Sequence, residues 1–394
     1  MSRASMYPIL RDSNSSTNSL EADVSWRLSN YFVTQLFFGT SSHLFAPYVI
    51  LDTADDKIWV QTYGCDPCFE VKGGNPNVQL SASFKLMSLD DPRCALPKFE
   101  YNGLCGYRSM YGSRSGPTTM GPMGTDTFLF IDSQTQKPTF FEDIAFGCGV
   151  ENKNIRFGGN TGPENTISGI CGLGPISPKS LINQLDAQVK GRFSYCLTSW
   201  AEPNLGRSTM YFGDDARIVG PTVQQIAMNT KIKYHLYFTG ISVDGKRLPI
   251  DKSVCAIGDT RTVTTGFFID SGAPSTALAK SAYQPLRLAL VSYFAQYGWQ
   301  PVKEQEYDLC YLSTPKEGQS YPTVVFHFSK GDQGGEVDWI MDKDNMFVRF
   351  GTVDGFCMVI GETPDPGPCI FGAYQHANFR VLYDVKKWST LFHP

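Results

Sequence analysis

Most of the chain alternates hydrophobic and polar residues or runs in short hydrophobic blocks, and Gly, Pro, Asn and Asp separate these blocks. Short segments of this kind between turn residues are typical of β-strands. The pattern predicts strands over Tyr31–Phe38, Phe45–Leu51, Tyr234–Val243, Thr323–Phe328 and Phe379–Tyr383. We therefore expect a mostly β fold with two or three helices.

Helical periodicity is confined to two segments. The first covers Pro178–Leu185, where Ser177 can cap the helix and Pro178 suits the first helical position. The second runs from about Lys280 to Tyr297. Its hydrophobic positions are Leu286, Leu288, Leu290, Val291 and Phe294.

One pattern occurs twice along the chain. A hydrophobic block ends in Asp at Tyr48–Ala54 and again at Phe267–Ala273. Each copy is followed at a distance by two hydrophobic residues and a Gly, at Ile170–Gly172 and Ile370–Gly372. At roughly 150 residues per domain, 394 residues suit two lobes. We expect a disordered tail over residues 1–20, an N-terminal lobe over 21–218 and a C-terminal lobe over 219–394.

The composition excludes several classes of protein. With 42% hydrophobic and 18% charged residues, the chain has enough apolar material for a core. The 34 basic residues are balanced by 38 acidic ones, which argues against a nucleic-acid partner. No stretch is long and apolar enough to span a membrane. We expect a monomer.

Eleven cysteines favour an oxidising compartment, and a secreted, vacuolar or apoplastic location is the corresponding expectation. Residues 1–30, however, contain no hydrophobic run of signal-peptide length. Either the chain is not secreted or its leader is missing from the sequence. Cys65 and Cys68 have the spacing of a zinc half-site, but no second close pair completes it, so we predict no metal.

Asp52 and Asp270 carry the candidate chemistry, because each ends a hydrophobic block. Two carboxylates about 3 Å apart repel by about 5 kcal/mol at an effective dielectric of about 20, so such a pair shares one proton. One carboxylate can then deprotonate a water molecule while the other polarises a peptide carbonyl. The alternative interpretation is that each Asp caps a turn after a strand.

Several ordered motifs resemble those of the pepsin-like (peptidase A1) aspartic proteases, and within them the plant nepenthesin-type group. The resemblance covers Tyr31 to Phe392 and rests on Asp52–Trp59, Asp270–Ala273, Phe146–Gly149, Ser168–Gly174, Phe193–Leu197 and Tyr374–Asp384. It implies a bilobal fold of two six-stranded-barrel-like lobes with a cleft between them. It also implies an endopeptidase with an acid optimum that takes an extended polypeptide and needs no cofactor.

The resemblance assigns roles to further residues. Tyr111, followed by Gly112, corresponds to the tyrosine of a hairpin flap that closes over the substrate. Tyr111 could equally be a half-buried strand aromatic. Thr53 and Ser271 would brace the two catalytic loops through backbone hydrogen bonds, and Gly272 belongs to the second loop.

The resemblance also suggests disulfides. Cys65, Cys68, Cys94 and Cys105 would tie the insertion after the first motif, and Cys310 would bridge to Cys357. The pairing of Cys148, Cys171, Cys196, Cys255 and Cys369 stays open, because one sequence does not determine connectivity. In a reducing compartment all eleven would be thiols.

Four residues depart from the family pattern. Ala54 replaces a Gly, and a Cβ there would cost roughly 1–2 kcal/mol if the position needs a positive φ. Asp55 replaces a Ser and must be protonated, turned away or paired, with Lys57 as the candidate partner. Ala273 lacks the hydroxyl of the second motif, and Arg114 replaces a Gly at the flap tip.

Two hypotheses for the function follow. The first is an aspartic endopeptidase with weakened activity. The second is a catalytically impaired homologue that serves as a protein-binding or inhibitor module. Nucleophilic hydrolases fit poorly, because the chain has no Gly-x-Ser-x-Gly elbow and its five histidines stand singly.

Overall fold

The computed structural model describes residues 19–27, 30–94, 99–112, 116–157, 162–198, 208–258, 265–304, 307–349 and 354–393. This part of the chain divides into two compact units. We call the first, up to Tyr195 and again from 208 to Arg217, the N-terminal unit, and the second, from Ile218 onwards with residues 196–198, the C-terminal unit. Each unit is described by itself.

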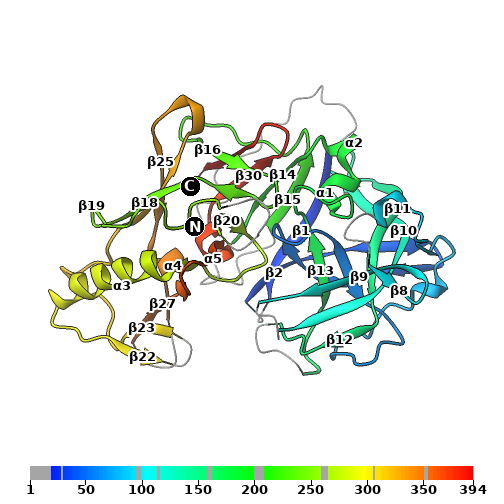
Figure 1. Ribbon diagram of the computed structural model, residues 1–394, viewed down its shortest axis with the longest axis horizontal. Coiled ribbons are helices and arrows are strands. Elements are labelled where there is room, and N and C mark those ends of the chain that lie inside the picture. Colours follow the sequence, from blue (N-terminus) through cyan, green and yellow to red (C-terminus); the bar gives the residue numbers. More distant parts are fainter. Residues whose placement is uncertain are drawn as a thin grey trace. The chain divides into compact units, whose positions relative to one another are not determined.

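The N-terminal unit is built almost entirely from antiparallel strands, blue to green in Figure 1. The two longest, β10 and β11, form a hairpin with a bulge between Asp126 and Phe128. The unit contains β1 (Ser19–Arg27), β2 (Tyr31–Gln35), β3 (Phe37–Thr40), β4 (His43–Phe45), β5 (Tyr48–Asp52), β6 (Ile58–Gln61), β7 (Lys85–Leu86), β8 (Glu100–Tyr101), β9 (Leu104–Met110), β10 (Thr118–Asp132), β11 (Pro138–Gly149), β12 (Glu151–Lys153), β13 (Ile167–Gly172), α1 (Leu181–Gln184), α2 (Asp186–Val189), β14 (Arg192–Cys196) and β15 (Ser208–Gly213).

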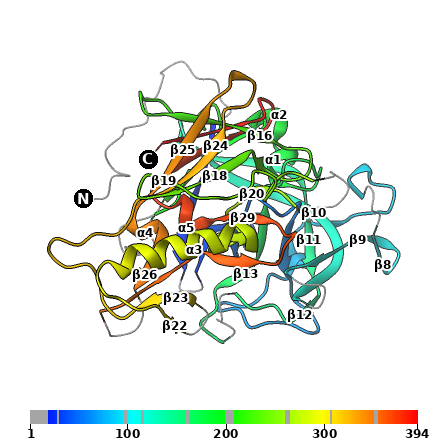
Figure 2. The same cartoon turned by 60° about the vertical axis from the view of Figure 1, so that its left-hand side comes forward.

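The C-terminal unit combines shorter strands with one long helix, α3, which packs beside β18 and β21 (Figure 2). The unit contains β16 (Gln224–Asn229), β17 (His235–Leu236), β18 (Phe238–Val243), β19 (Lys246–Arg247), β20 (Phe267–Asp270), β21 (Ala277–Ala279), α3 (Lys280–Ala295), β22 (Val302–Glu304), β23 (Tyr307–Tyr311), β24 (Val324–Ser329), β25 (Glu336–Met341), α4 (Lys343–Met346), β26 (Phe347–Arg349), β27 (Phe356–Met358), β28 (Gly361–Thr363), β29 (Cys369–Gly372), α5 (Ala373–His376), β30 (Arg380–Asp384) and β31 (Ser389–His393).

The predicted strands are present, although three of them divide. The segment 45–51 covers the last residue of β4 and most of β5. The segment 31–38 forms β2 and β3, because the Leu36 amide leaves the ladder and donates to Pro47 O at 3.0 Å. The segment 234–243 forms β17 and β18. Local hydrophobic patterning identified the strands but not the interruptions within them.

The helix predictions were partly wrong. The segment from 280 forms α3, in which Leu286, Leu290 and Phe294 are buried, but Leu288 is 61% exposed because it lies off the buried face. The other helix does not begin at Pro178. Residues 177–180 form a turn in which Ser177 Oγ accepts from the Lys179 amide, and α1 begins only at Leu181. The turn competes with the helix for the capping hydroxyl.

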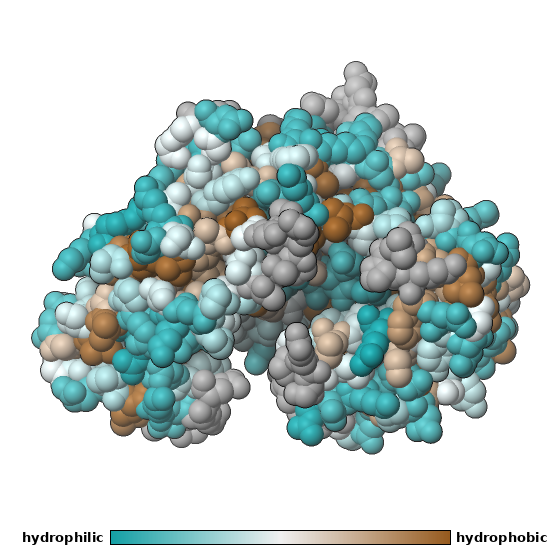
Figure 3. All heavy atoms as spheres, in the orientation of Figure 1, coloured by the Kyte–Doolittle hydropathy of each residue, from teal (hydrophilic) through white to brown (hydrophobic). Residues whose placement is uncertain are grey.

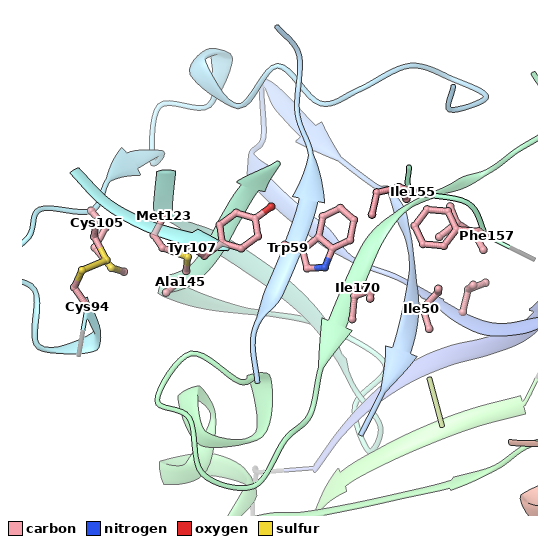
Figure 4. Packing of buried hydrophobic residues seen from close by; sticks show 13 residues of the cluster. Ile50, Trp59, Cys94, Cys105, Tyr107, Met123, Ala145, Ile155, Phe157 and Ile170 are labelled. Atoms are coloured by element: carbon pink, nitrogen blue, oxygen red, sulfur yellow. A yellow bond between two sulfur atoms is a disulfide. The ribbon is translucent and has the colours of Figure 1, made fainter. Parts of the chain in front are cut away.

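A dense hydrophobic core fills each unit. In the N-terminal unit the fully buried Trp59 lies among residues from β5, β9 and β13, including Ile50, Tyr107 and Ile170 (Figure 4). In the C-terminal unit edge-on and tilted rings of Phe267, Phe326, Phe328, Trp339 and Phe371 form the equivalent packing. Aromatic burial on this scale dominates the stability of a β fold.

Both units contain the same arrangement of four strands. In the N-terminal unit β13 lies between β5, to which it is parallel, and β6, to which it is antiparallel, and β11 runs parallel to β6. In the C-terminal unit β29, β20, β21 and β28 repeat each of these relations. The repeated sequence pattern therefore reflects a repeated topology.

Four disulfides are formed, Cys65–Cys68, Cys94–Cys105, Cys255–Cys369 and Cys310–Cys357. The pair Cys255–Cys369 is one that the sequence left open. Cys148 and Cys171 carry free thiols. Burial raises the pKa of the Cys148 thiol to about 12 and raises that of Cys171 as well, so both stay protonated and unreactive.

On the face drawn in Figure 3, hydrophobic residues form small separate groups within a largely hydrophilic surface. No helix among the residues that the structure describes is long and apolar enough to cross a membrane. The described residues likewise contain no group of three or more His, Cys, Asp or Glu side chains that could hold a metal ion.

Candidate active site

The first Asp loop, residues 52–57, connects β5 to β6. Asp52 ends β5 in register with Gly172 of β13, and the residue is 8% exposed. Its Oδ1 accepts hydrogen bonds from the backbone amides of Ala54, at 2.7 Å, and Asp55, at 2.9 Å. Amide donors of this kind stabilise a charged carboxylate that burial would otherwise penalise.

The second Asp loop, residues 270–276, connects β20 to β21 and repeats this arrangement. Asp270 ends β20 in register with Gly372 of β29, and it is half-buried. Its Oδ1 accepts from the amides of Gly272, at 2.8 Å, and Ala273, at 3.2 Å. Each Asp thus does cap its own turn, as the alternative interpretation held, and does so with one oxygen of the carboxylate.

The two glycines of the repeat are required by close packing. A Cβ on Gly172 would lie 2.4 Å from Lys57 O, and one on Gly372 would lie 2.2 Å from the carbonyl carbon of Ser275. Neither distance is compatible with a side chain. The glycines allow β13 and β29 to pass directly against the Asp loops, and this contact fixes the backbone that carries each carboxylate.

The condition for backbone strain at Ala54, a positive φ, is not met. Ala54 is not among the described residues with positive φ, so its Cβ carries no left-handed penalty. Thr53 and Ser271 are buried, at 0% and 1% exposure. Their roles in bracing the loops remain a proposal.

Asp55 is paired rather than turned away. Its Oδ1 lies 3.4 Å from Lys57 Nζ and also accepts from the Lys57 amide at 3.2 Å. The ammonium donates in addition to Ser109 Oγ on β9, at 3.1 Å. Burial lowers the pKa of Lys57, but the carboxylates of Asp55 and Asp56 outweigh it and the pKa is raised overall. Lys57 is therefore a fixed cation beside the first Asp loop.

Tyr111 directly follows β9 and is both a half-buried aromatic and a polar partner of the first Asp loop. Its hydroxyl donates to Asp55 Oδ2 at 2.7 Å and accepts from Trp59 Nε1, also at 2.7 Å. Burial, together with the charge of Asp55, raises the pKa of Tyr111 well above its usual value, so the phenol keeps its proton. Gly112 follows with φ of +69°, and Arg114 lies outside the described residues.

Sequence reasoning missed Ser109 and the indole N–H of Trp59 as partners in this network. Both come from strands whose side chains meet only after folding, about fifty residues apart in the chain. Lys57 was recognisable from its spacing after Asp55, since charged residues two apart in a tight loop can face the same side.

Ser242, His327 and Asp338 form a hydrogen-bonded series across β18, β24 and β25. Ser242 Oγ lies 2.7 Å from His327 Nε2, and His327 Nδ1 lies 2.7 Å from Asp338 Oδ1. The order is that of a serine hydrolase. However, Asp338 is 57% exposed, and β18 is paired with β19 on one edge and β24 on the other. Backbone amides engaged in a sheet do not form an oxyanion hole, so we interpret the series as the satisfied polar contacts of a buried histidine.

A separate cavity of about 630 Å³ lies in the C-terminal unit between α3 and the β18–β19 hairpin. Its walls include Leu288, Tyr293 and Lys246. No residue of either Asp loop lines it. We therefore assign it no part in the candidate site.

Two family models match the chain. One, described as Xylanase inhibitor N-terminal, matches residues 32–214, and the other, described as Xylanase inhibitor C-terminal, matches residues 233–394. Together they cover both Asp loops.

Curated relatives are similar over most of the chain. Aspartic proteinase nepenthesin-1 of Nepenthes gracilis is 31% identical over 375 residues, which cover 90% of this chain and 75% of the relative. Aspartic proteinase nepenthesin-2 of the same species is 30% identical, covering 92% and 77%.

Solved structures share the fold. The crystal structure of edgp matches with a TM-score of 0.75 at 18% identity, covering 95% of this chain and 94% of that one. Basic 7S globulin from soybean matches with a TM-score of 0.73 at 17% identity, covering 96% of each chain. The predicted mostly β, pepsin-like fold is confirmed.

Proposed function

This chain belongs to the pepsin-like aspartic protease family, among the relatives of the plant nepenthesins, and we propose that it is an aspartic endopeptidase that uses Asp52 and Asp270. The observation that carries the proposal is the matched hydrogen bonding of the two aspartates. Each ends a parallel strand beside a close-packed glycine, and each gives one oxygen to two amides of its own loop.

The chemistry is general acid–base hydrolysis by a pair of carboxylates that share one proton. The ionised carboxylate takes a proton from a water molecule, whose oxygen attacks the peptide carbonyl carbon. The protonated carboxylic acid donates to the carbonyl oxygen. Collapse of the tetrahedral intermediate breaks the C–N bond. The amine takes the proton that the first carboxylate removed from water, and the second carboxylate recovers its proton from a hydroxyl of the intermediate. Because one carboxyl must hold a proton, the activity has an acid optimum.

The substrate is a polypeptide in an extended conformation. An extended peptide can bind by main-chain hydrogen bonds in the manner of an added strand, which β-rich proteins favour. Tyr111 is the residue of the β9–β10 hairpin that we assign to the substrate side of the first Asp loop, and Gly112 permits the turn beside it.

Cleavage of acid-denatured globin from pH 2 to 7, with and without pepstatin, tests the proposal. We expect pepstatin-sensitive cleavage in the wild type and none in Asp52→Asn or Asp270→Asn. Asp251→Asn, which changes an exposed carboxylate outside both loops, is the matched control and should cleave as the wild type does. Absence of pepstatin-sensitive cleavage at every pH would rule out the proposed peptidase activity.

A second candidate function is protein binding without cleavage. It is favoured by the match to family models described as xylanase inhibitors and by Asp55, which replaces the Ser of the family pattern and whose amide donates to Asp52 Oδ1. In this case the chain would bind an enzyme such as a xylanase and inhibit it. The two functions separate cleanly, because inhibition would persist in Asp52→Asn and Asp270→Asn whereas proteolysis would not.

A further inference from the structure

The hydroxyl of Tyr111 has already used its one hydrogen as a donor. Its single hydrogen goes to Asp55 Oδ2 at 2.7 Å, and its oxygen already accepts the indole N–H of Trp59 at 2.7 Å. Trp59 is 0% exposed and held by the core, so it provides a fixed point. Tyr111 is therefore tied to the first Asp loop at two points.

The acceptor for this hydrogen is itself held in place. Asp55 is 8% exposed, and a buried carboxylate requires a partner. Lys57 supplies the charge at 3.4 Å, and its second contact, to Ser109 Oγ at 3.1 Å, joins the loop to the strand that leads into Tyr111. Two contacts thus connect the first Asp loop to the end of β9. One joins Asp55 to Tyr111, and the other joins Lys57 to Ser109.

The hairpin that carries Tyr111 is paired right up to its turn. The Tyr111 amide donates to Pro117 O at 2.9 Å, and β9 pairs with β10 from Met110 to Thr118 onwards. Fixing Tyr111 therefore fixes the turn end of the β9–β10 ladder and not a lone side chain.

We propose that Asp55 and Lys57 are positioning residues, which form a charged latch that holds Tyr111 and the turn end of the β9–β10 ladder against the first Asp loop. The latch preorganises the hairpin so that a peptide substrate does not have to order it on binding. It acts on substrate binding rather than on the chemical step. The latch itself rests on the contacts above, and only its effect on substrate rests on the proposed function.

Nitration of Tyr111 by tetranitromethane, followed by peptide mass spectrometry, tests the latch without any need for activity. Tyr63, which is 71% exposed, serves as the internal standard in the same molecule. We expect Tyr111 to be protected in the wild type. A hydrogen bond to a charged group shifts the ratio of bound to released states by about tenfold or more, so Asp55→Ser should raise the relative nitration of Tyr111 by about tenfold.

Further variants separate the roles of charge and shape. Asp55→Asn keeps an acceptor but loses the charge, and should give a smaller rise than Asp55→Ser. Lys57→Met should also raise nitration, and Lys57→Arg should restore protection because it keeps the cation. Lys190→Met removes an exposed ion pair with Asp214 and is the matched control, which should leave Tyr111 protected. Near-ultraviolet circular dichroism verifies that each variant is folded.

Steady-state kinetics on a fluorogenic peptide tests the effect on substrate. Asp55→Ser should raise KM several-fold while kcat changes much less. The latch is overturned if wild-type Tyr111 is nitrated as fast as Tyr63, or if Asp55→Ser and Asp55→Asn both leave its nitration unchanged. Its role in substrate binding is overturned if nitration rises but kcat falls and KM does not move. A wild type without activity but with a protected Tyr111 would reject the proposed function and retain the latch.

Discussion

The two Asp loops share a scaffold and differ in what surrounds it. Around Asp52 the loop carries Asp55 and Lys57, and it is bonded to Tyr111 of the β9–β10 hairpin. Around Asp270 the corresponding position holds Ala273, which has no charge and donates its amide to the carboxylate at 3.2 Å. Asp52 is buried, whereas Asp270 is half-buried.

This comparison separates the features that hold a carboxylate from those that modify its environment. The parallel strand pair, the close-packed glycine and the two amide donors occur in both loops and position the aspartate. The charged side chains of Asp55 and Lys57 occur in the first loop only. Asp55 replaces a Ser and adds a carboxylate, and Lys57 pairs with that carboxylate. The first loop is therefore the one in which function can differ from that of the relatives.

We expect the largest effect from replacing the two aspartates, which both loops have in common. If both aspartates act as one pair, Asp52→Asn and Asp270→Asn should each lower peptidase activity by at least about 100-fold, despite their different surroundings. Assays of globin cleavage at acid pH measure this. A variant that keeps most of the activity would show that the two loops are not functionally equivalent.

The next effect tests the shared packing. Gly172→Ala and Gly372→Ala each place a Cβ within 2.4 Å of backbone atoms, and should lower the free energy of unfolding by about 3 kcal/mol or more. Gly162→Ala and Gly361→Ala are the matched controls in the two units, since a Cβ at either meets nothing within 4 Å. Urea denaturation compares the four, and equal losses in variants and controls would refute the packing argument.

We expect a smaller effect from the ion pair of Asp55 and Lys57, which only the first loop has. Lys57→Met leaves Asp55 without its counterion in a buried site, and should cost about 2 kcal/mol near neutral pH, less than a fully buried pair because Lys57 is 17% exposed. The raised pKa of Lys57 means that this contribution is present below the ordinary lysine pKa of 10.5 and is lost as pH rises through the raised value. The stability difference should therefore persist to about pH 9. A loss of the difference below that pH would contradict the assignment.

The repeated scaffold could be predicted from the sequence because its signals are local. A hydrophobic block ending in Asp and a distant hydrophobic pair followed by Gly were sufficient to predict two similar lobes and both candidate aspartates. In the structure each Asp ends a strand that pairs in parallel with the strand that carries the downstream Gly.

The surroundings could not be predicted, because they depend on residues that meet only in the folded chain. The contact between Lys57 and Ser109 joins residues 52 positions apart, and the bond between Trp59 and Tyr111 does the same. The Cys255–Cys369 pairing spans 114 residues. The cost considered at Ala54 required a positive φ, which the residue type alone does not determine and which Ala54 does not adopt.

The smallest effect returns to Ala54. Since its φ is not positive, restoring the glycine of the relatives relieves no strain and adds freedom to the unfolded chain. Ala54→Gly should therefore destabilise the protein by about 0.4–1 kcal/mol. Thermal and urea unfolding measure this difference, and a stabilised variant would show that the first loop is strained after all.

The most direct test of the central claim is calorimetric titration of the protein with pepstatin at acid pH. We predict that one pepstatin binds per wild-type chain, and that binding is lost in both Asp52→Asn and Asp270→Asn because the proposed mechanism requires both carboxyl groups. A wild type that does not bind pepstatin, or two variants that bind it as the wild type does, would contradict the claim that the two loops act as one catalytic pair.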